Sequence, residues 1–137
     1  MSPKNTNEQI LVVDDDPDAR EILNIILGTL DISIVQARNG FEALEAVANQ
    51  PPLLIVLDLS MPHLDGEAVV QKLRENPETA GLPVIIFTAK TLTNEELARL
   101  DVPSHMIVRK GHLSMTNLRV LVMDILSSKA GLTFENL

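Results

Sequence analysis

Five short apolar runs rich in β-branched residues recur along the chain, and segments with helical spacing separate them. Four of the runs are continuous rather than alternating, which is typical of strands buried on both faces of a parallel sheet. The β–α alternation, with connections of ordinary length, predicts one α/β domain: a doubly wound, five-stranded parallel sheet with helices on both faces. The predicted strands are Ile10–Val13, Ile32–Ala37, Leu53–Leu57, Val84–Phe87 and Met106–Val108.

Several helix starts are marked by capping residues. Pro17 suits a first helical position with Asp16 as the N-cap. The segments that begin at Asn39 and Thr93 each resemble a capping box, with Glu three residues later. A further helix is expected over residues 67–75, before an Asn-Pro pair.

The last helix, over about residues 114–128, is apolar nearly all round. Val120 and Met123 lie off its main stripe, and with the last strand and the helix that begins at Thr93 they predict a surface for effector binding or self-association. The stripe expected to face the sheet consists of Leu118, Leu121, Val122 and Ile125.

Composition narrows the functional classes. The 137 residues suit one domain, expected over residues 9–129 with tails at 1–8 and 130–137. A net charge of −8 and only three aromatic residues argue against nucleic-acid binding, which needs cations and stacking rings. The absence of cysteine fits a reducing compartment, no apolar run reaches the length of a membrane span, and we expect no signal peptide. We therefore expect a soluble, cytoplasmic protein.

Polar residues follow four of the predicted strands at the point where each ends. An Asp14-Asp15-Asp16 run follows the first strand, Asp58 the third, Thr88 the fourth, and Lys110 comes just beyond the fifth. Ligands of open parallel sheets bind beyond the carboxyl ends of the strands, so we expect these side chains to share one site.

The chemistry open to such a group is narrow. Two carboxylates about 4 Å apart repel by roughly 4 kcal/mol at an effective dielectric of 20, so the site needs a cation. Oxygen ligands without nearby His or Cys favour Mg²⁺ with a phosphoryl group. Thr88 can donate a hydrogen bond to a phosphoryl oxygen, and Lys110 can act on another as a point charge. Asp58 stands alone after a central strand, which makes it the candidate nucleophile. The run of three Asp leaves its register open by one residue, with Asp16 favoured as a helix cap.

Over about residues 9–129 the chain resembles a response-regulator receiver domain of two-component signalling, which implies a flavodoxin-like fold. The intervals are those of the family: 43 residues from Asp15 to Asp58, 30 to Thr88 and 22 more to Lys110. The motifs that carry the resemblance are Leu-Val-Val-Asp-Asp-Asp-Pro at 11–17, Leu-Asp-Leu-Ser-Met-Pro-His-Leu-Asp-Gly at 57–66, Thr-Ala at 88–89, and Lys110.

The resemblance implies a role for each matching residue. Asp58 would accept a phosphoryl group from a phosphohistidine of a sensor histidine kinase or a histidine phosphotransfer protein. Asp15 would ligate Mg²⁺ directly, Asp14 would hold it through water, and Ser60 would contribute its backbone carbonyl. Thr88 and Lys110 would bind the phosphoryl oxygens. Such a protein switches partner binding or relays the phosphoryl group, and it is an acceptor able to dephosphorylate itself rather than a turnover enzyme.

Two positions depart from the family pattern. Ile107 stands where receivers usually carry an aromatic residue that reports phosphorylation, and Gly111 stands where a proline usually follows the lysine. Lys90, two residues after Thr88, occupies a position that by family analogy tunes the lifetime of the phosphoryl group. We therefore expect the phosphoacceptor chemistry to be intact, but we do not expect phosphorylation to be reported by the aromatic residue that the family usually uses.

Two other functions compete with this interpretation. The Asp14-Asp15-Asp16 run also fits a phosphohydrolase of the haloacid-dehalogenase type, although Pro17 stands where that family places Thr or Val. Multiple turnovers on phosphate esters would favour that class. A pseudo-receiver scaffold would instead bind its partners equally well with and without a phosphoryl analogue.

Overall fold

The computed structural model describes residues 8–111 and 114–131 and contains one parallel five-stranded sheet of order β2-β1-β3-β4-β5. This order and the parallel pairing confirm the predicted doubly wound fold. The observed bounds differ from the predicted ones by a residue or so; Met106, for example, ends a 3₁₀ turn (Ser104–Met106) instead of opening the last strand. The strands are β1 (Gln9–Val13), β2 (Ser33–Ala37), β3 (Leu54–Leu57), β4 (Val84–Thr88) and β5 (Ile107–Arg109).

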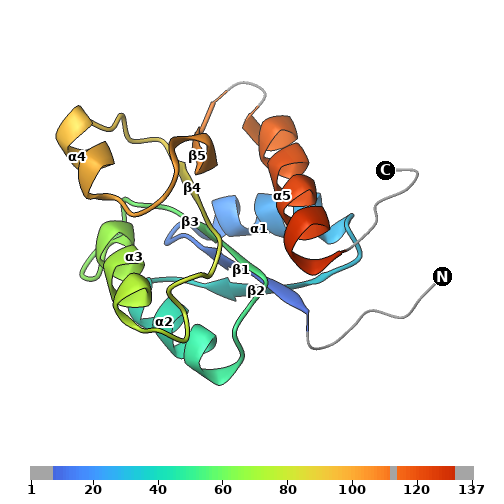
Figure 1. Ribbon diagram of the computed structural model, residues 1–137. Helices are drawn as coiled ribbons and strands as arrows, with labels where there is room; N and C mark the ends of the chain where they lie inside the picture. Colours follow the sequence, from blue (N-terminus) through green and yellow to red (C-terminus); the bar gives the residue numbers. More distant parts are fainter. Residues whose placement is uncertain (1–7, 112–113, 132–137) are drawn as a thin grey trace.

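Helices cover both faces of the sheet (Figure 1). One face carries α1 and α5, which contact each other, and the other carries α2 and α3. The short helix α4 is tied to α3 by an ion pair between Arg99 Nε and Glu67 Oε1, 2.9 Å apart. The helices are α1 (Pro17–Gly28), α2 (Gly40–Asn49), α3 (Gly66–Glu75), α4 (Asn94–Arg99) and α5 (Ser114–Ala130).

The helix caps follow the sequence signals with two differences. Asp16 caps α1, and Thr93 with Glu96 forms the full capping box of α4, as predicted. At α2 the Asn39 side chain accepts from the Glu42 N–H, but the Glu42 carboxylate accepts from the N–H of Arg38 instead of closing the box. At α3 the N-cap is Asp65, which the sequence analysis did not identify as a cap.

Burial follows position in the sheet. Every residue of β3 and β4, and all but the first of β1, is buried, whereas β2 and β5 at the edges are partly exposed. Three of the four continuous apolar runs therefore mark the central strands β1, β3 and β4, which carry the Asp run, Asp58 and Thr88 at their carboxyl ends. The fourth run, Met106–Val108, was expected to be buried on both faces, but β5 lies at the partly exposed edge of the sheet. A rigid core thus supports the candidate site.

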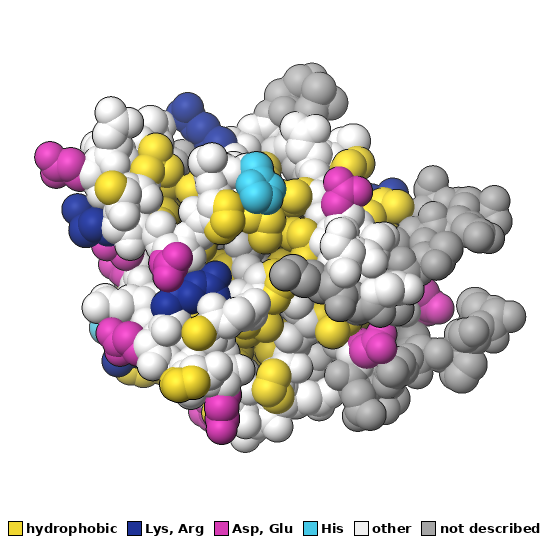
Figure 2. Space-filling model, in the orientation of Figure 1, with side chains coloured by type: hydrophobic (Ala, Val, Ile, Leu, Met, Phe, Trp, Pro, Cys, Tyr) yellow, Lys and Arg dark blue, Asp and Glu magenta, His cyan; other side chains and the backbone are white. Residues whose placement is uncertain are grey.

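The packing of α5 differs from the predicted stripe. Its buried apolar residues are Leu118, Val122 and Leu126, spaced four apart, while Leu121 and Ile125 are only half-buried. These two line a cleft of about 510 Å³ between α5 and the amino end of β4, on a face where apolar side chains gather (Figure 2). Val120 is 52% exposed, and the docking role suggested for it and Met123 remains a prediction.

No helix within the described part of the chain has the length and apolarity to cross a bilayer. Residues 1–7 and 132–137, most of the two predicted tails, lie outside the described residues. The predicted domain limits at residues 9 and 129 stay a prediction.

Candidate phosphoacceptor and metal site

The acidic run after β1 divides into separate roles. The Asp14 N–H donates to Ala37 O at 3.2 Å, which extends the β1–β2 ladder and buries the Asp14 side chain. The Asp14 carboxylate accepts the Asp16 N–H at 3.0 Å, and Asp16 in turn accepts the Asp18 N–H at 3.0 Å as the cap of α1. Asp16 is therefore the N-cap of α1, as expected, and the assignment of Asp14 and Asp15 as metal ligands stays a prediction.

Asp58 is fixed by the backbone on both sides. Its N–H donates to Val13 O at 3.0 Å, and its Oδ1 accepts the Ser60 N–H at 3.3 Å. Gly66, the first residue of α3, packs directly against this turn, because a Cβ there would lie 2.4 Å from Asp58 O and 2.8 Å from Leu59 Cα. Only glycine fits this position, and it lets α3 begin close behind the acceptor candidate.

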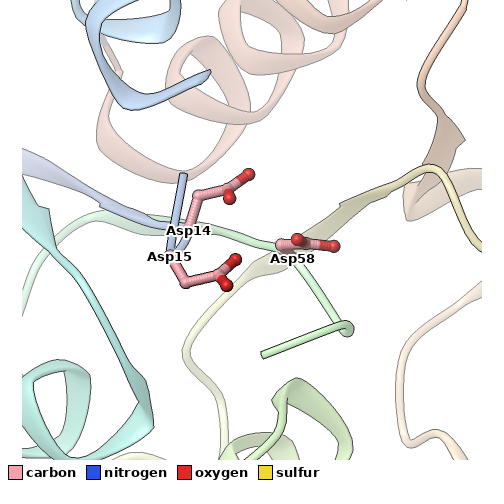
Figure 3. A group of neighbouring side chains, drawn as sticks. All are labelled: Asp14, Asp15 and Asp58. Carbon is pink, nitrogen blue, oxygen red and sulfur yellow. The ribbon is translucent and has the colours of Figure 1, made fainter. Parts of the chain in front are cut away.

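Three carboxylates gather at the carboxyl ends of β1 and β3 (Figure 3). One carboxylate oxygen from each of Asp14, Asp15 and Asp58 lies within 4.8 Å of the others. Asp14 and Asp58 are buried, whereas Asp15 is exposed. An all-oxygen donor set with one solvent-facing member suits a hard divalent ion such as Mg²⁺, which keeps several of its waters.

Lys110 supplies the positive charge of the cluster. Its Nζ lies 2.7 Å from Asp14 Oδ2 and 3.7 Å from Asp58 Oδ2. Its backbone N–H donates to Thr88 O at 2.8 Å, which fixes where the side chain starts. Burial alone lowers the pKa of Lys110, but the hydrogen bond and charge of Asp14 and the charge of Asp58 outweigh it, so the pKa is raised. The ammonium therefore stays charged at neutral pH.

The pKa of Asp58 is raised above its ordinary value. Burial is the largest cause, and the neighbouring Asp14 charge adds to it. Lys110, the Ser60 N–H and a hydrogen bond from the Thr88 side chain act in the opposite direction. A buried carboxylate with a raised pKa beside a second buried carboxylate is the arrangement expected where a cation or a phosphoryl group is meant to bind.

Thr88 ends β4 with its side chain almost fully buried, at 1% exposure. Its Oγ1 also accepts the Lys90 N–H at 3.2 Å. The Lys90 ammonium forms an ion pair with Glu96 of α4. The structure thus brings together Asp14, Asp15, Asp58, Thr88 and Lys110, while Ser60 adjoins them through its N–H.

Sequence reasoning missed two contacts of this site. The Arg20 Nη1 donates to Asp14 O at 2.7 Å, holding the turn after β1. The ring of Phe87 lies under Lys110, with 5.6 Å between its centroid and Nζ. Arg20 lies one helical turn after the Asp16 cap and Phe87 directly precedes Thr88, but neither position signals such a contact without the fold. Of the three histidines, His63 and His105 are exposed, and His112 lies outside the described residues.

Comparison with known sequences adds a family to this geometry. A model of the response regulator receiver domain matches residues 10–122. The response regulator MprA of Mycobacterium sp. (strain KMS) is 42% identical over 93 residues, which cover 68% of this chain and 40% of the relative. The chain therefore spans about two fifths of the length of the curated relatives it matches.

Solved structures give the same fold. The response regulator TrrA from Thermotoga maritima, in complex with Mg²⁺ and BeF, is 30% identical with a TM-score of 0.74, over 87% of this chain and 99% of that one. The receiver domain of Francisella response regulator 1452 is 27% identical with a TM-score of 0.76, over 88% and 98%.

Proposed function

This chain belongs to the response regulator receiver domain family, and from that premise we propose that it is a phosphoacceptor module whose Asp58 receives a phosphoryl group. The observation that carries the proposal is the convergence of Asp58, two further carboxylates, Thr88 and Lys110 at one edge of the sheet.

The proposed step is a nucleophilic displacement. A carboxylate oxygen of Asp58 attacks the phosphorus of a phosphohistidine, a P–O bond forms, and the P–N bond breaks. The leaving imidazole nitrogen keeps the electron pair of that bond and takes up a proton. The Lys110 charge and the Ser60 N–H favour the ionised carboxylate that this attack requires.

The residues that would hold Mg²⁺ are Asp14, Asp15, Asp58 and the backbone carbonyl of Ser60. The fit rests on the chemistry of the donor set, three carboxylates within 4.8 Å, and on the Mg²⁺ named in the Thermotoga complex. When bound, the ion supplies positive charge that neutralises the phosphoryl oxygens. Asp14 then shares its charge between the ion and Lys110.

Thr88 and Lys110 are proposed to bind the phosphoryl oxygens and so to couple phosphorylation to a change in conformation. The Lys110 ammonium, 3.7 Å from Asp58 Oδ2, needs only a small shift to reach an added oxygen. The Thr88 hydroxyl would donate to a phosphoryl oxygen in place of the Asp58 carboxylate. A ligand shifts a conformational equilibrium only by its differential contacts, and these two side chains supply them.

The partners follow from this chemistry. The donor is proposed to be a sensor histidine kinase or a histidine phosphotransfer protein, and the readout is a change in effector binding or self-association involving α4, β5 and α5. Receiver domains are signalling modules rather than turnover enzymes; hydrolysis of its own acyl phosphate, which would reset the switch, is part of the proposal. The proposal keeps the cytoplasmic location expected from the sequence.

Intact-mass measurement after incubation with Mg²⁺ and acetyl phosphate tests the proposal. We expect a labile gain of about 80 Da, one phosphoryl group. The gain should vanish without Mg²⁺ and in Asp58→Asn, and persist in the matched control Asp101→Asn, an exposed acid outside the cluster. Failure of wild type to gain mass from either acetyl phosphate or a phosphorylated kinase would contradict the proposal and favour the pseudo-receiver. Sustained turnover of phosphate esters would favour the phosphohydrolase.

A further inference from the structure

Lys110 reaches its partners across most of the sheet. It follows β5, the edge strand, yet its ammonium bonds Asp14, which follows β1, three strands away in the order β1-β3-β4-β5. Its side chain must therefore pass over the end of β4. A four-carbon stem with freely rotating bonds does not hold such a path by itself.

Phe87 lies beneath this path. It is the penultimate residue of β4, is paired in register with Val108, and is 1% exposed, so neighbouring core residues hold its ring firmly. The ring centroid lies 5.6 Å from Lys110 Nζ. The face of an aromatic ring carries partial negative charge and attracts a cation within about 6 Å.

The other two partners of the ammonium change during the proposed reaction. Asp14 shares its charge with Mg²⁺ when the ion binds, and Asp58 becomes an acyl phosphate. The Phe87 ring keeps its charge distribution and its place throughout. It is the constant partner of Lys110 among the described contacts of that ammonium.

We infer that Phe87 is a positioning residue for Lys110, whose ammonium its ring face holds over the end of β4 within reach of the phosphoryl oxygens. The inference rests on the proposed function. It assigns to Phe87 an aromatic contribution to the site in a chain that has Ile107 at the usual aromatic position. Phe87 acts from below the lysine and need not rotate.

Fluorination changes the charge distribution of the Phe87 ring but hardly its size, so it separates an electrostatic role of the ring from its role in packing. Beryllofluoride with Mg²⁺ serves as the phosphoryl analogue, and calorimetry gives its affinity. A ring-trifluorinated phenylalanine at position 87, which removes the negative face, should weaken binding about fivefold, as should Phe87→Leu. The same replacements at Phe41, which is 63% exposed on α2, should leave affinity unchanged.

A double-mutant cycle tests whether Phe87 acts on beryllofluoride binding through Lys110. If Phe87 acts through Lys110, the fluorinated ring should cost nothing further in a Lys110→Ala background. A fluorine NMR signal from para-fluorinated phenylalanine at position 87 should shift in Lys110→Met, and the signal at position 41 should not. An unchanged signal at 87, or an equal loss of affinity with and without Lys110, would overturn the inference. Absence of Mg²⁺-dependent beryllofluoride binding to wild type would instead overturn the proposed function, and this inference with it.

Discussion

Replacement of Asp58 by Asn should stabilise the metal-free protein. The side chain keeps its size and most of its hydrogen bonds, but it no longer places a buried negative charge beside Asp14. Functional sites commonly keep groups that lower the stability of the fold. If Asp58 is such a group, its replacement should give a protein that is more stable but no longer accepts a phosphoryl group. The size of the effect follows from the Coulomb interactions of the Asp58 charge with its neighbours and from the burial of that charge.

The Coulomb terms nearly cancel. At an effective dielectric of 20, Lys110 at 3.7 Å attracts the Asp58 charge by about 4.5 kcal/mol. Asp14 at the 4.8 Å limit repels it by about 3.5 kcal/mol. Asp15 is exposed and adds less than 1 kcal/mol in water. The remaining term is burial, the largest cause of the raised pKa of Asp58. We therefore expect a gain of about 1 kcal/mol, or roughly 3–4 °C in Tm.

Urea unfolding followed by far-ultraviolet circular dichroism measures this gain, since the chain contains no Trp or Tyr for fluorescence. The comparison is made in EDTA, with Asp101→Asn as the neutral control. Excess Mg²⁺ should reverse the order, because the ion stabilises wild type by mass action and the variant lacks one of its ligands. An Asn variant less stable than wild type in EDTA would refute the reasoning.

The pH dependence has the same origin. The raised pKa of Asp58 means that the folded state binds a proton that the unfolded state has already released, over the interval between the two pKa values. Stability therefore falls as pH rises through that interval, and this component is absent from Asp58→Asn. The difference in unfolding free energy between the two proteins should accordingly shrink as the pH is lowered.

Three further substitutions, one of them paired with a control, test other parts of the site. Lys110→Gln leaves the buried Asp14 carboxylate without its cation and should cost about 2–3 kcal/mol in EDTA by urea unfolding, partly restored by Mg²⁺. Because the pKa of Lys110 is raised, the stability it contributes is present below its unfolded value and is lost as pH rises through the folded one. Gly66→Ala forces a Cβ into the β3–α3 turn and should cost about 1–3 kcal/mol by calorimetry. Gly28→Ala, in open space at the end of α1, should be neutral or slightly stabilising. Thr88→Val keeps its shape but loses a donor to a charged oxygen, so beryllofluoride affinity should fall about tenfold.

The sheet was predictable because its signal is local. Continuous apolar runs marked β1, β3 and β4, which are buried on both faces, and caps at Asp16 and Thr93 marked two helix starts. The rotation of α5 was not predictable in the same way. Its sequence is apolar nearly all round, so periodicity alone does not decide between burying Leu126 and burying Ile125.

The residues of the site, too, divide into those that local sequence signals predict and those that only the fold reveals. Its acids, hydroxyl and lysine could be predicted because parallel strands end at a common edge, so that order in the sequence implies proximity in space. The contacts of Lys110 could not, because they depend on the path of a long side chain across β4. In the sequence, Phe87 looks like any apolar residue of a core strand. Its role becomes visible only in the structure, where the Lys110 ammonium lies over its ring.

We expect phosphorylation at Asp58 to change the protein surface through a movement of α4, and not through an aromatic residue on β5. Ile107 is half-buried and has no polar atom to re-pair, and the space around Gly111 is open. Thr88 Oγ1, by contrast, accepts the Lys90 N–H, and the Lys90 ammonium pairs with Glu96, which also closes the capping box of α4. If the Thr88 side chain moves so that its hydroxyl reaches a phosphoryl oxygen, Oγ1 shifts away from the Lys90 N–H, while the Lys90 ammonium stays paired with Glu96 in the first turn of α4. A six-residue helix with no buried residue has little packing to resist that displacement, so α4 is where we expect phosphorylation first to change the surface.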